Sequence, residues 1–389
     1  MEVFVGSRSK RQGSIDPWGP GRWRVRLSYG AEGSKRQRLS KVIRGTKEDA
    51  QRYLNAAIRR REQNEPVVLS REAFGVWTDE WLRTWCSALA PRTRADYAGI
   101  FKRYLTPELR ARKLAALTAS DIQHFINDLA GSGLGPRTVA MVHGAIRACL
   151  SKAVKLGKLP RNVARDVELP RKAHVERVFF TPDEARRFCE AVRGDRWEAF
   201  FLLLVHTGLR PGEALGLKWS DIEGTSLRVR RALVRIPGED PMLEDTKTPR
   251  SRRVIPLGEQ VSESLQRHRR SQVEWRLKLG AAYQDHDLIF ANETGGFVDC
   301  QNVRGRHFKP ILKAAKLPEV RLYDLRHCCA TMLLASGEHP KVVQERLGHA
   351  SITLTLDTYS HVVPGMQERA SQRLDELLRP AQAGAKANG

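Results

Sequence analysis

The sequence predicts a mixed, mainly α-helical protein in three parts. These are a small N-terminal β-sheet with one helix, a four-helix bundle, and a mostly helical third part that contains a small antiparallel β-sheet. Three observations predict this fold class. The 389 residues suffice for about two to four domains. Apolar residues make up 41% of the chain, which is enough for ordinary hydrophobic cores. Apolar positions recur every second residue near the N-terminus and every three or four residues over most of the rest.

The N-terminal part, residues 1–65, is a basic unit with 16 Lys and Arg against 7 Asp and Glu. Between residues 22 and 27, apolar and arginine side chains alternate, which predicts a strand with one buried and one basic face. Residues 35–43 read as a second basic strand, and Thr46 begins a helix. A solvated charged face is the alternative to a DNA-binding face. The candidate DNA contacts are Arg22, Arg24, Arg26, Lys35, Arg36 and Arg38.

The middle part, residues 72–160, carries helical periodicity throughout and predicts a bundle of four helices. The last of these helices runs from Thr138 to Leu156, after a Gly-rich break that ends at Pro136. Residues 160–172 are polar and carry two prolines, Pro160 and Pro170, so we expect a linker over residues 161–176.

The third part, residues 177–379, is the largest unit. Thr181 followed by Pro182 marks a helix start, and residues 197–206 form a strongly apolar helix. Residues 227–236 and 252–257 read as strands. Residues 366–378 have the spacing of a short amphipathic helix, and the Ala- and Gly-rich residues 380–389 predict a disordered tail.

The whole chain is strongly basic, with a formal net charge of +23. Such a field attracts polyanions, so nucleic acid is the first partner to consider and an acidic membrane surface the second. We find no apolar run of about 18 residues and no signal-peptide pattern, which argues against the membrane. We therefore expect a cytoplasmic protein that acts on nucleic acid.

Four short motifs in the third part share one order and spacing. Residues 206–215 read HTGLRPGEAL, residues 323–331 read YDLRHCCAT, residues 347–349 read LGH, and residues 357–362 read DTYSHV. Each motif alone is weak, but all four together in one domain are specific. This set resembles the tyrosine recombinase family, in particular the phage-type site-specific integrases. The resemblance extends to the helical bundle, as a core-binding domain, and to the N-terminal sheet, as an arm-type DNA-binding domain.

The resemblance implies a role for each motif. Arg210 and Arg326 would bracket a DNA phosphate, because guanidinium groups are permanently charged bidentate donors. Tyr359 would attack it and form a 3′-phosphotyrosine, releasing a 5′-hydroxyl. His349 would donate a hydrogen bond to a phosphate oxygen, and Lys247 would protonate the leaving oxygen. A backbone-phosphate contact is the alternative role for Lys247, and Arg250 and Arg252 are rival candidates for the proton donor.

Three further residues have supporting roles in this interpretation. Tyr323 stands where the family commonly has histidine, which weakens any assignment of acid or base chemistry to it. His327 follows Arg326 directly and need not share its helix face, so a structural role is equally open. Glu213 is expected to be a buried partner that orients an arginine or His349.

The predicted function is therefore a site-specific DNA recombinase that integrates and excises a phage or other mobile element. The chemistry requires no cofactor, and the histidine spacing does not favour a metal site. The expected partners are double-stranded DNA, three further copies of the chain in a homotetramer, and accessory DNA-bending or directionality proteins. A non-catalytic DNA-binding protein, a topoisomerase and a recombinase that resolves chromosome or plasmid dimers remain alternatives.

Overall fold

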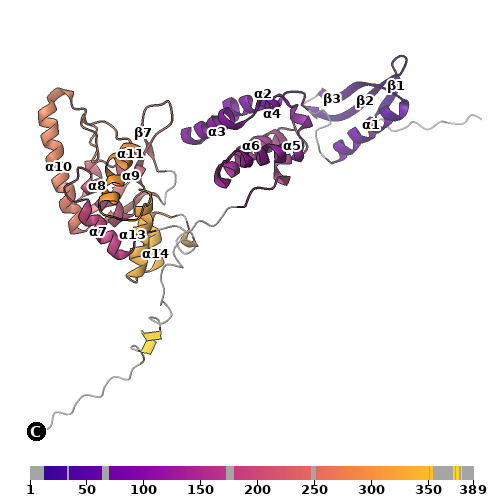
Figure 1. Ribbon diagram of the computed structural model, residues 1–389. Helices are drawn as coiled ribbons and strands as arrows, with labels where there is room; N and C mark the ends of the chain where they lie inside the picture. The colour runs from indigo at the N-terminus through magenta and orange to yellow at the C-terminus, as the bar shows by residue number, and fades with distance from the viewer. Residues whose placement is uncertain are drawn as a thin grey trace, which may run out of the picture. The chain divides into compact units, whose positions relative to one another are not determined.

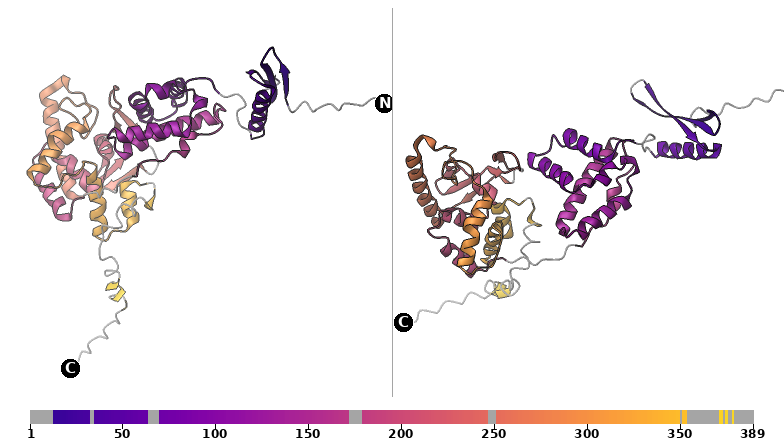
Figure 2. Two further views of the ribbon diagram at one scale, coloured as in Figure 1. Left: turned by 45° about the vertical axis from the view of Figure 1, so that its right-hand side comes forward. Right: turned by 45° about the horizontal axis from the view of Figure 1, so that its top comes forward.

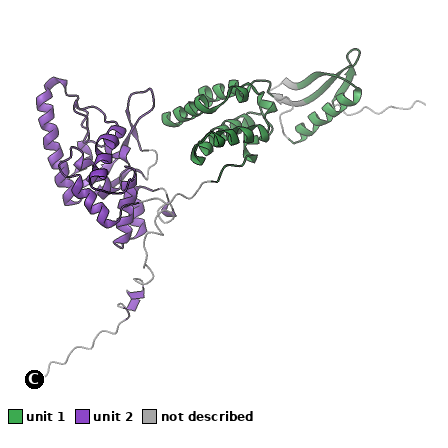
Figure 3. Ribbon diagram, in the orientation of Figure 1, with its two compact units in different colours: residues 1–174 green, residues 175–389 purple. Residues whose placement is uncertain are grey.

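The structure is a computed structural model that divides into two compact units, residues 1–174 and 175–389 (Figure 3). It describes residues 13–32, 35–63, 70–171, 179–246, 251–349, 351–353, 371–372, 374–375 and 378, without the side chains of residues 29–37. Helices predominate in both units, and the sheets are small and antiparallel. The predicted fold class is confirmed.

The N-terminal sheet has three antiparallel strands in the order β1-β2-β3, followed by helix α1 (Figure 1). Val25 and Leu27 of β2 are buried against Leu54 of α1, as the alternation predicts. Thr46 caps α1 through a reciprocal pair of hydrogen bonds with Asp49, so the predicted helix start is confirmed. The bounds are β1 (Ser14–Pro17), β2 (Arg22–Glu32), β3 (Lys35–Arg44) and α1 (Lys47–Glu62).

The helical bundle in the same unit has a separate hydrophobic core built around Phe74, Trp77 and Ile146. Lys158 ties its first helix to its last segment through ion pairs of 2.8 Å with Glu72 and 3.0 Å with Glu80. A short additional helix, α4, lies between the second and third of the four predicted ones. The bounds are α2 (Phe74–Glu80), continued by the π-helical turn η1 (Trp81–Trp85), α3 (Pro91–Tyr104), α4 (Pro107–Ala111), η2 (Leu114–Ala116), α5 (Ala119–Gly131) and α6 (Pro136–Lys155).

The linker predicted at residues 161–176 does not begin at residue 161. Asn162 donates hydrogen bonds to the Arg147 carbonyl and the Ser151 hydroxyl, both at 2.8 Å, and so fastens this segment to α6. The short helix η3 (Val163–Asp166) then buries Val163 and Ala164 in the bundle core. Two apolar positions in this polar stretch thus pack against the bundle, while residues 172–176 lie outside the described residues.

The second unit is built around α8, in which eight of ten residues are buried. Thr181 caps α7 with Glu184 as expected, and α10 lies at the edge of the unit in all views (Figures 1 and 2). Its helices are α7 (Pro182–Ala191), α8 (Glu198–Thr207), α9 (Pro211–Leu215), η4 (Trp219–Asp221), α10 (Glu259–Leu279), η6 (Gly280–Ala282), α11 (Cys300–Val303), η7 (Arg304–Phe308), α12 (Lys309–Ala314), α13 (Asp324–Ala335) and α14 (Pro340–Leu347).

The strand predicted at residues 227–236 is divided between two small sheets. Its first half pairs with the strand predicted at 252–257, and its second half forms a hairpin that packs on α9. There, a Cβ added at Gly216 would lie 2.8 Å from the Leu233 amide nitrogen, and one at Gly212 would lie 3.0 Å from the Leu233 carbonyl oxygen, so both glycines allow β6 to pack closely on α9. The strands are β4 (Ile222–Glu223), β5 (Ser226–Val229), β6 (Arg231–Val234), β7 (Met242–Asp245) and β8 (Arg253–Pro256).

Most of the amphipathic helix predicted at residues 366–378 lies outside the described residues, as does the predicted tail 380–389. Of that helix, Leu374 and Leu378 are described, and both are largely exposed. Among the described helices, none has the length and hydropathy needed to cross a membrane.

Candidate phosphate-binding site

The first motif forms a tight connection between α8 and α9 that positions Arg210. Gly208 ends α8 in the left-handed conformation, with φ of 66°, which glycine adopts without steric cost. Arg210 is the N-cap residue of α9, and Pro211 occupies the first turn of that helix. The Arg210 side chain is 37% exposed, so it is accessible to a ligand from solvent while its backbone is fixed.

Arg326 approaches the same place from α13 and is almost completely buried, at 1% exposure. Its Nη1 donates to the Gly208 carbonyl at 2.7 Å, and its Nη2 donates to the Leu347 carbonyl at 2.6 Å. One guanidinium thus joins the first motif to the end of α14. Burial and the nearby Arg210 lower the pKa of Arg326 to about 10, so it stays charged at neutral pH.

His349 directly follows the left-handed Gly348 that ends α14. Its backbone amide donates to the Gln344 carbonyl at 3.1 Å, and the Gln344 side chain donates back to the His349 carbonyl at 3.2 Å. Burial, and then the charges of Arg326 and Arg210, lower the pKa of His349 to about 4. The imidazole is therefore neutral at physiological pH, with one ring nitrogen able to donate and the other able to accept.

Glu213 is a buried carboxylate shared between two arginines. It accepts from Arg210 Nη1 at 2.5 Å and from the Arg210 backbone amide at 3.0 Å. Burial alone would raise its pKa, but the charges of Arg253 and Arg210 outweigh that effect and hold the pKa below its ordinary value. The sequence led us to expect such a buried partner of an arginine, and the structure places Glu213 there.

The second arginine on Glu213, Arg253, was missed by the sequence analysis. It lies in β8, with a side chain only 6% exposed, and its Nη2 donates to Glu213 at 2.9 Å. A signal was available, since Arg253 and buried Ile255 share one face of the strand while Val254 on the other face is 58% exposed. An arginine on the buried face of a strand requires a partner.

Tyr323 and His327 lie beside the arginines. Glu213 first, and then Tyr323, keep the pKa of Arg210 above its ordinary value despite burial. The rings of Tyr323 and His327 meet edge to face at 5.6 Å, and Phe179 packs on His327 at 5.3 Å. His327 is thus packed between two aromatic rings, whereas Tyr323 is 40% exposed.

Lys247 and Tyr359 lie outside the described residues, and so does Arg250. The segment before Lys247 is fixed by the Thr246 amide, which donates to the Arg230 carbonyl at 3.1 Å. Arg252, just before β8, forms an exposed ion pair of 2.7 Å with Asp245 at the end of β7. The described part of the site thus contains Arg210, Arg326 and His349, with Glu213, Tyr323 and His327 around them.

The basic face of the N-terminal sheet is partly engaged by its own strand β1. Arg26 forms an ion pair of 2.8 Å with Asp16, and the Arg24 guanidinium lies over the ring of Trp18. Arg22 and Arg38 are exposed. The side chains of Lys35 and Arg36 lie outside the described part.

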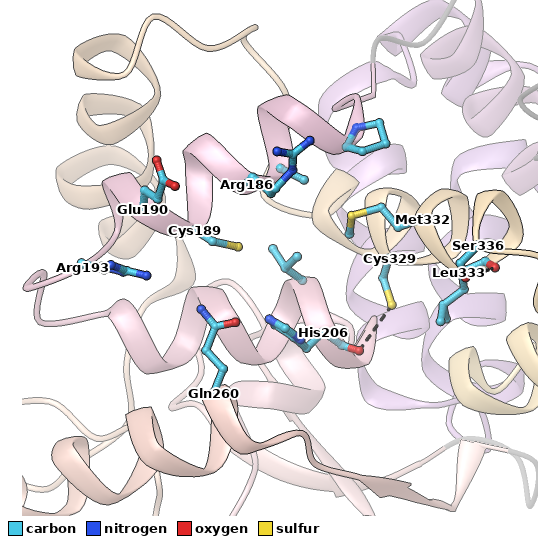
Figure 4. Close-up of a pocket in the computed structure, with 13 residues that line it drawn as sticks. Arg186, Cys189, Glu190, Arg193, His206, Gln260, Cys329, Met332, Leu333 and Ser336 are labelled. Atoms are coloured by element: carbon cyan, nitrogen blue, oxygen red, sulfur yellow. Dashed lines mark hydrogen bonds between the residues drawn. The ribbon is translucent and has the colours of Figure 1, made fainter.

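A separate cavity of about 490 Å³ lies between α7, α8 and α13 (Figure 4). Cys189, His206, Cys329 and Met332 line it, but Arg210, Arg326 and His349 do not. The cavity therefore does not coincide with the arginine cluster. Within the described ranges, no three acidic, histidine or cysteine side chains form a group that could hold a metal ion.

Comparison with known proteins gives consistent matches. The model of the phage integrase family matches residues 178–365, and the model of the phage integrase N-terminal SAM-like domain matches residues 73–130. The tyrosine recombinase XerC-like protein of Caldanaerobacter subterraneus subsp. tengcongensis is 29% identical over 92% of this chain and 96% of its own length. The ICEBs1 integrase of Bacillus subtilis is 26% identical over 92% of this chain and 98% of its own.

Solved structures share the fold. The Tn1549 transposon integrase in complex with a circular intermediate DNA has a TM-score of 0.65 at 20% identity, covering 78% of this chain and 99% of that one. The lambda integrase tetramer bound to a Holliday junction has a TM-score of 0.56 at 19% identity, covering 91% and 96%. The family models and the relatives show an enzyme that breaks and rejoins DNA. The chain belongs to the phage integrase family, the tyrosine site-specific recombinases.

Proposed function

We propose that this recombinase cleaves and rejoins DNA through Tyr359, with the scissile phosphate held between Arg210 and Arg326, and that it integrates and excises a mobile element. The pairing of these arginines carries the proposal. They come from segments more than a hundred residues apart, yet the charge of Arg210 helps to lower the pKa of Arg326, so the two guanidinium groups lie at close range. Holding two like charges together is costly unless an anion is to be bound between them.

The groups around this phosphate would divide the chemistry among them. Arg210 and Arg326 would neutralise charge on the pentavalent phosphate, and neutral His349 would hydrogen-bond one of its oxygens. Tyr359 would attack and form a 3′-phosphotyrosine, while Lys247 would give a proton to the leaving 5′ oxygen. The phosphotyrosine conserves the energy of the broken bond, so rejoining needs no nucleotide.

The two parts of the first unit would bind DNA without taking part in the reaction. Residues 72–160 would contact the strand-exchange site, and the basic sheet of residues 1–65 would bind distal, arm-type sites through residues such as Arg22 and Arg38. Residues 177–379 would form the catalytic domain. This arrangement supports integration and excision over simple dimer resolution.

The proposed active form is a homotetramer on double-stranded DNA. The lambda integrase, whose fold this chain shares, was solved as a tetramer bound to a Holliday junction, which supports this assembly. The exposed Leu374 and Leu378 suit a C-terminal segment that docks on a neighbouring copy. Accessory DNA-bending or directionality proteins would join this assembly.

A two-site plasmid assay tests the function. A supercoiled plasmid carrying the element's two attachment sites, incubated with the protein and its accessory factors, is expected to yield the recombined products. Relaxation without exchange would indicate a topoisomerase, and binding without either product would indicate a non-catalytic DNA-binding protein. Tyr359→Phe serves as the matched inactive control.

A further inference from the structure

Arg253 connects three segments of the proposed active site through a single buried guanidinium. Its Nη2 donates to Glu213 Oε2 at 2.9 Å, its Nε to the Arg346 carbonyl at 2.7 Å, and its Nη1 to the Ser251 carbonyl at 3.0 Å. Three of the five N–H groups of the guanidinium are therefore used within the protein. We accordingly assign to Arg253 a role in holding these segments rather than in binding DNA.

The acceptors of Arg253 belong to functionally different places. Glu213 holds Arg210 by its side chain and backbone. Arg346 lies in the last turn of α14, three residues before His349. Ser251 immediately follows the segment that contains Lys247. Arg253 thus fixes the surroundings of one phosphate-binding arginine and of the histidine at the same time.

The charge of Arg253 matters as much as its geometry. Glu213 and Arg253 are both nearly buried, with side chains 3% and 6% exposed, and their ion pair is therefore poorly screened. Without Arg253, the carboxylate of Glu213 would be balanced mainly by Arg210 and would compete with the phosphate for it. Lysine cannot replace the planar fork that serves three acceptors at once.

We propose that Arg253 is a positioning residue of the strand-cleavage reaction, which holds Glu213 and the end of α14 so that Arg210 and His349 reach the same phosphate. This inference rests on the proposed function of the cluster. It assigns to Arg253 no contact with the reacting atoms. Its effect is exerted through Arg210 and His349.

The test is single-turnover cleavage of nicked DNA that carries the strand-exchange site, measured as covalent adduct formed over time. Arg253→Met preserves the length of the apolar stem and is expected to reduce the cleavage rate by about 10²-fold, the cost typical of a misplaced catalytic group. The cleavage rate of Arg253→Lys should lie between those of Arg253→Met and the wild type. DNA affinity should change little, since the proposal assigns Arg253 no contact with DNA. Arg228→Met, which removes a half-exposed arginine from the adjacent strand β5, is the matched control and should cleave normally.

A methylphosphonate at the scissile position separates positioning from loss of stability. This substitution removes the negative charge that Arg210 must neutralise, so a defect that acts through Arg210 should shrink. We expect the rate difference between wild type and Arg253→Met to fall at least tenfold on this substrate. An equal defect on both substrates, or wild-type cleavage by Arg253→Met, would overturn the proposal.

Two further measurements keep the result interpretable. Arg253→Met leaves the buried carboxylate of Glu213 with one ion-pair partner fewer, and this loss can destabilise the fold. The double variant Glu213→Gln/Arg253→Met removes both charges of the buried pair. It should fold, as checked by its melting temperature, and still cleave slowly; wild-type cleavage by the folded double variant also overturns the proposal. If the wild type itself forms no adduct, the proposed function fails rather than the role of Arg253.

Discussion

Two arginines in one site are held by acceptors of different kinds. Arg326 is buried and bound by the carbonyls of Gly208 and Leu347, so its guanidinium is fixed before any ligand arrives. Arg210 is 37% exposed and balanced by Glu213. In the proposed site, Arg326 would therefore be a preorganised donor, whereas Arg210 would adjust to the phosphate.

This difference leads to a prediction for Arg210. Arg210→Ala removes one phosphate donor and should reduce single-turnover cleavage by about 10²–10³-fold. The fold should persist, because Glu213 keeps its ion pair with Arg253. Arg228→Ala, which deletes a surface arginine paired with Glu223, provides the comparison. Equal rates for the two variants would show that Arg210 does not contact the phosphate.

His349 should make the stability of the free protein depend on pH. Its pKa is about 4 in the folded protein, against about 6.5 in an unfolded chain. As the pH falls from 6.5 toward 4, the unfolded chain takes up a proton that folded His349 does not, so stability is lost in that window. The melting temperature of the wild type should therefore fall more steeply over this range than that of His349→Gln. Parallel curves would mean that folding does not lower the pKa of His349.

At this scale, the sequence revealed residues that lie in recognisable runs and missed those that do not. Arg210, Arg326 and His349 lie within contiguous motifs, so each could be named from its neighbours. Arg253 lies in a strand, and its hydrogen-bond partners Glu213 and Arg346 are 40 and 93 residues away along the chain. Such a partnership depends on tertiary contacts, which periodicity alone does not give.

Among the elements, the turn between α8 and α9 does most to shape the site. Gly208 is left-handed, and a Cβ there would lie 2.4 Å from Leu347 Cδ2 and 3.3 Å from Cys329 Sγ. The carbonyl of the same residue accepts from Arg326. The turn therefore packs against α13 and α14 while it holds their arginine.

Gly208→Ala should lower the free energy of unfolding by more than the left-handed conformation alone explains. Gly224 has nearly the same φ, 58° against 66°, but open space around its Cα. Gly224→Ala should cost about 1–2 kcal/mol of unfolding free energy, the penalty for a left-handed alanine. Gly208→Ala should cost clearly more, because Leu347 must also move. Urea denaturation of both variants measures the difference, and equal costs would contradict the packing described here.

Helix starts were the most predictable feature of the elements. Thr46 and Thr181 each bond the residue three positions on, a local interaction that the sequence displays directly. Sheet membership was less predictable. Residues 227–236 look like one strand, but the chain passes from one sheet to the other at Arg230. Beyond that point, β6 packs on α9 at Gly212 and Gly216.

At the scale of the whole molecule, the net charge of +23 implies binding that depends strongly on salt. The N-terminal sheet has its own small core, so its removal should leave the other parts folded. Deleting residues 1–65 should weaken binding to distal arm-type sites more than to the strand-exchange site. It should also reduce the salt slope of binding by about 0.9 for each lost phosphate contact. Titrations at several salt concentrations decide this, and an unchanged slope would mean that the sheet does not contact DNA.

The central claim is that Tyr359 becomes covalently joined to DNA at this arginine cluster. The most direct measurement is to incubate the protein with nicked DNA from the element's own attachment site, denature it, and look for a protein–DNA adduct. We predict an adduct with the wild type and none with Tyr359→Phe, while both bind the DNA equally well. An adduct that persists in Tyr359→Phe would contradict the assignment of the nucleophile.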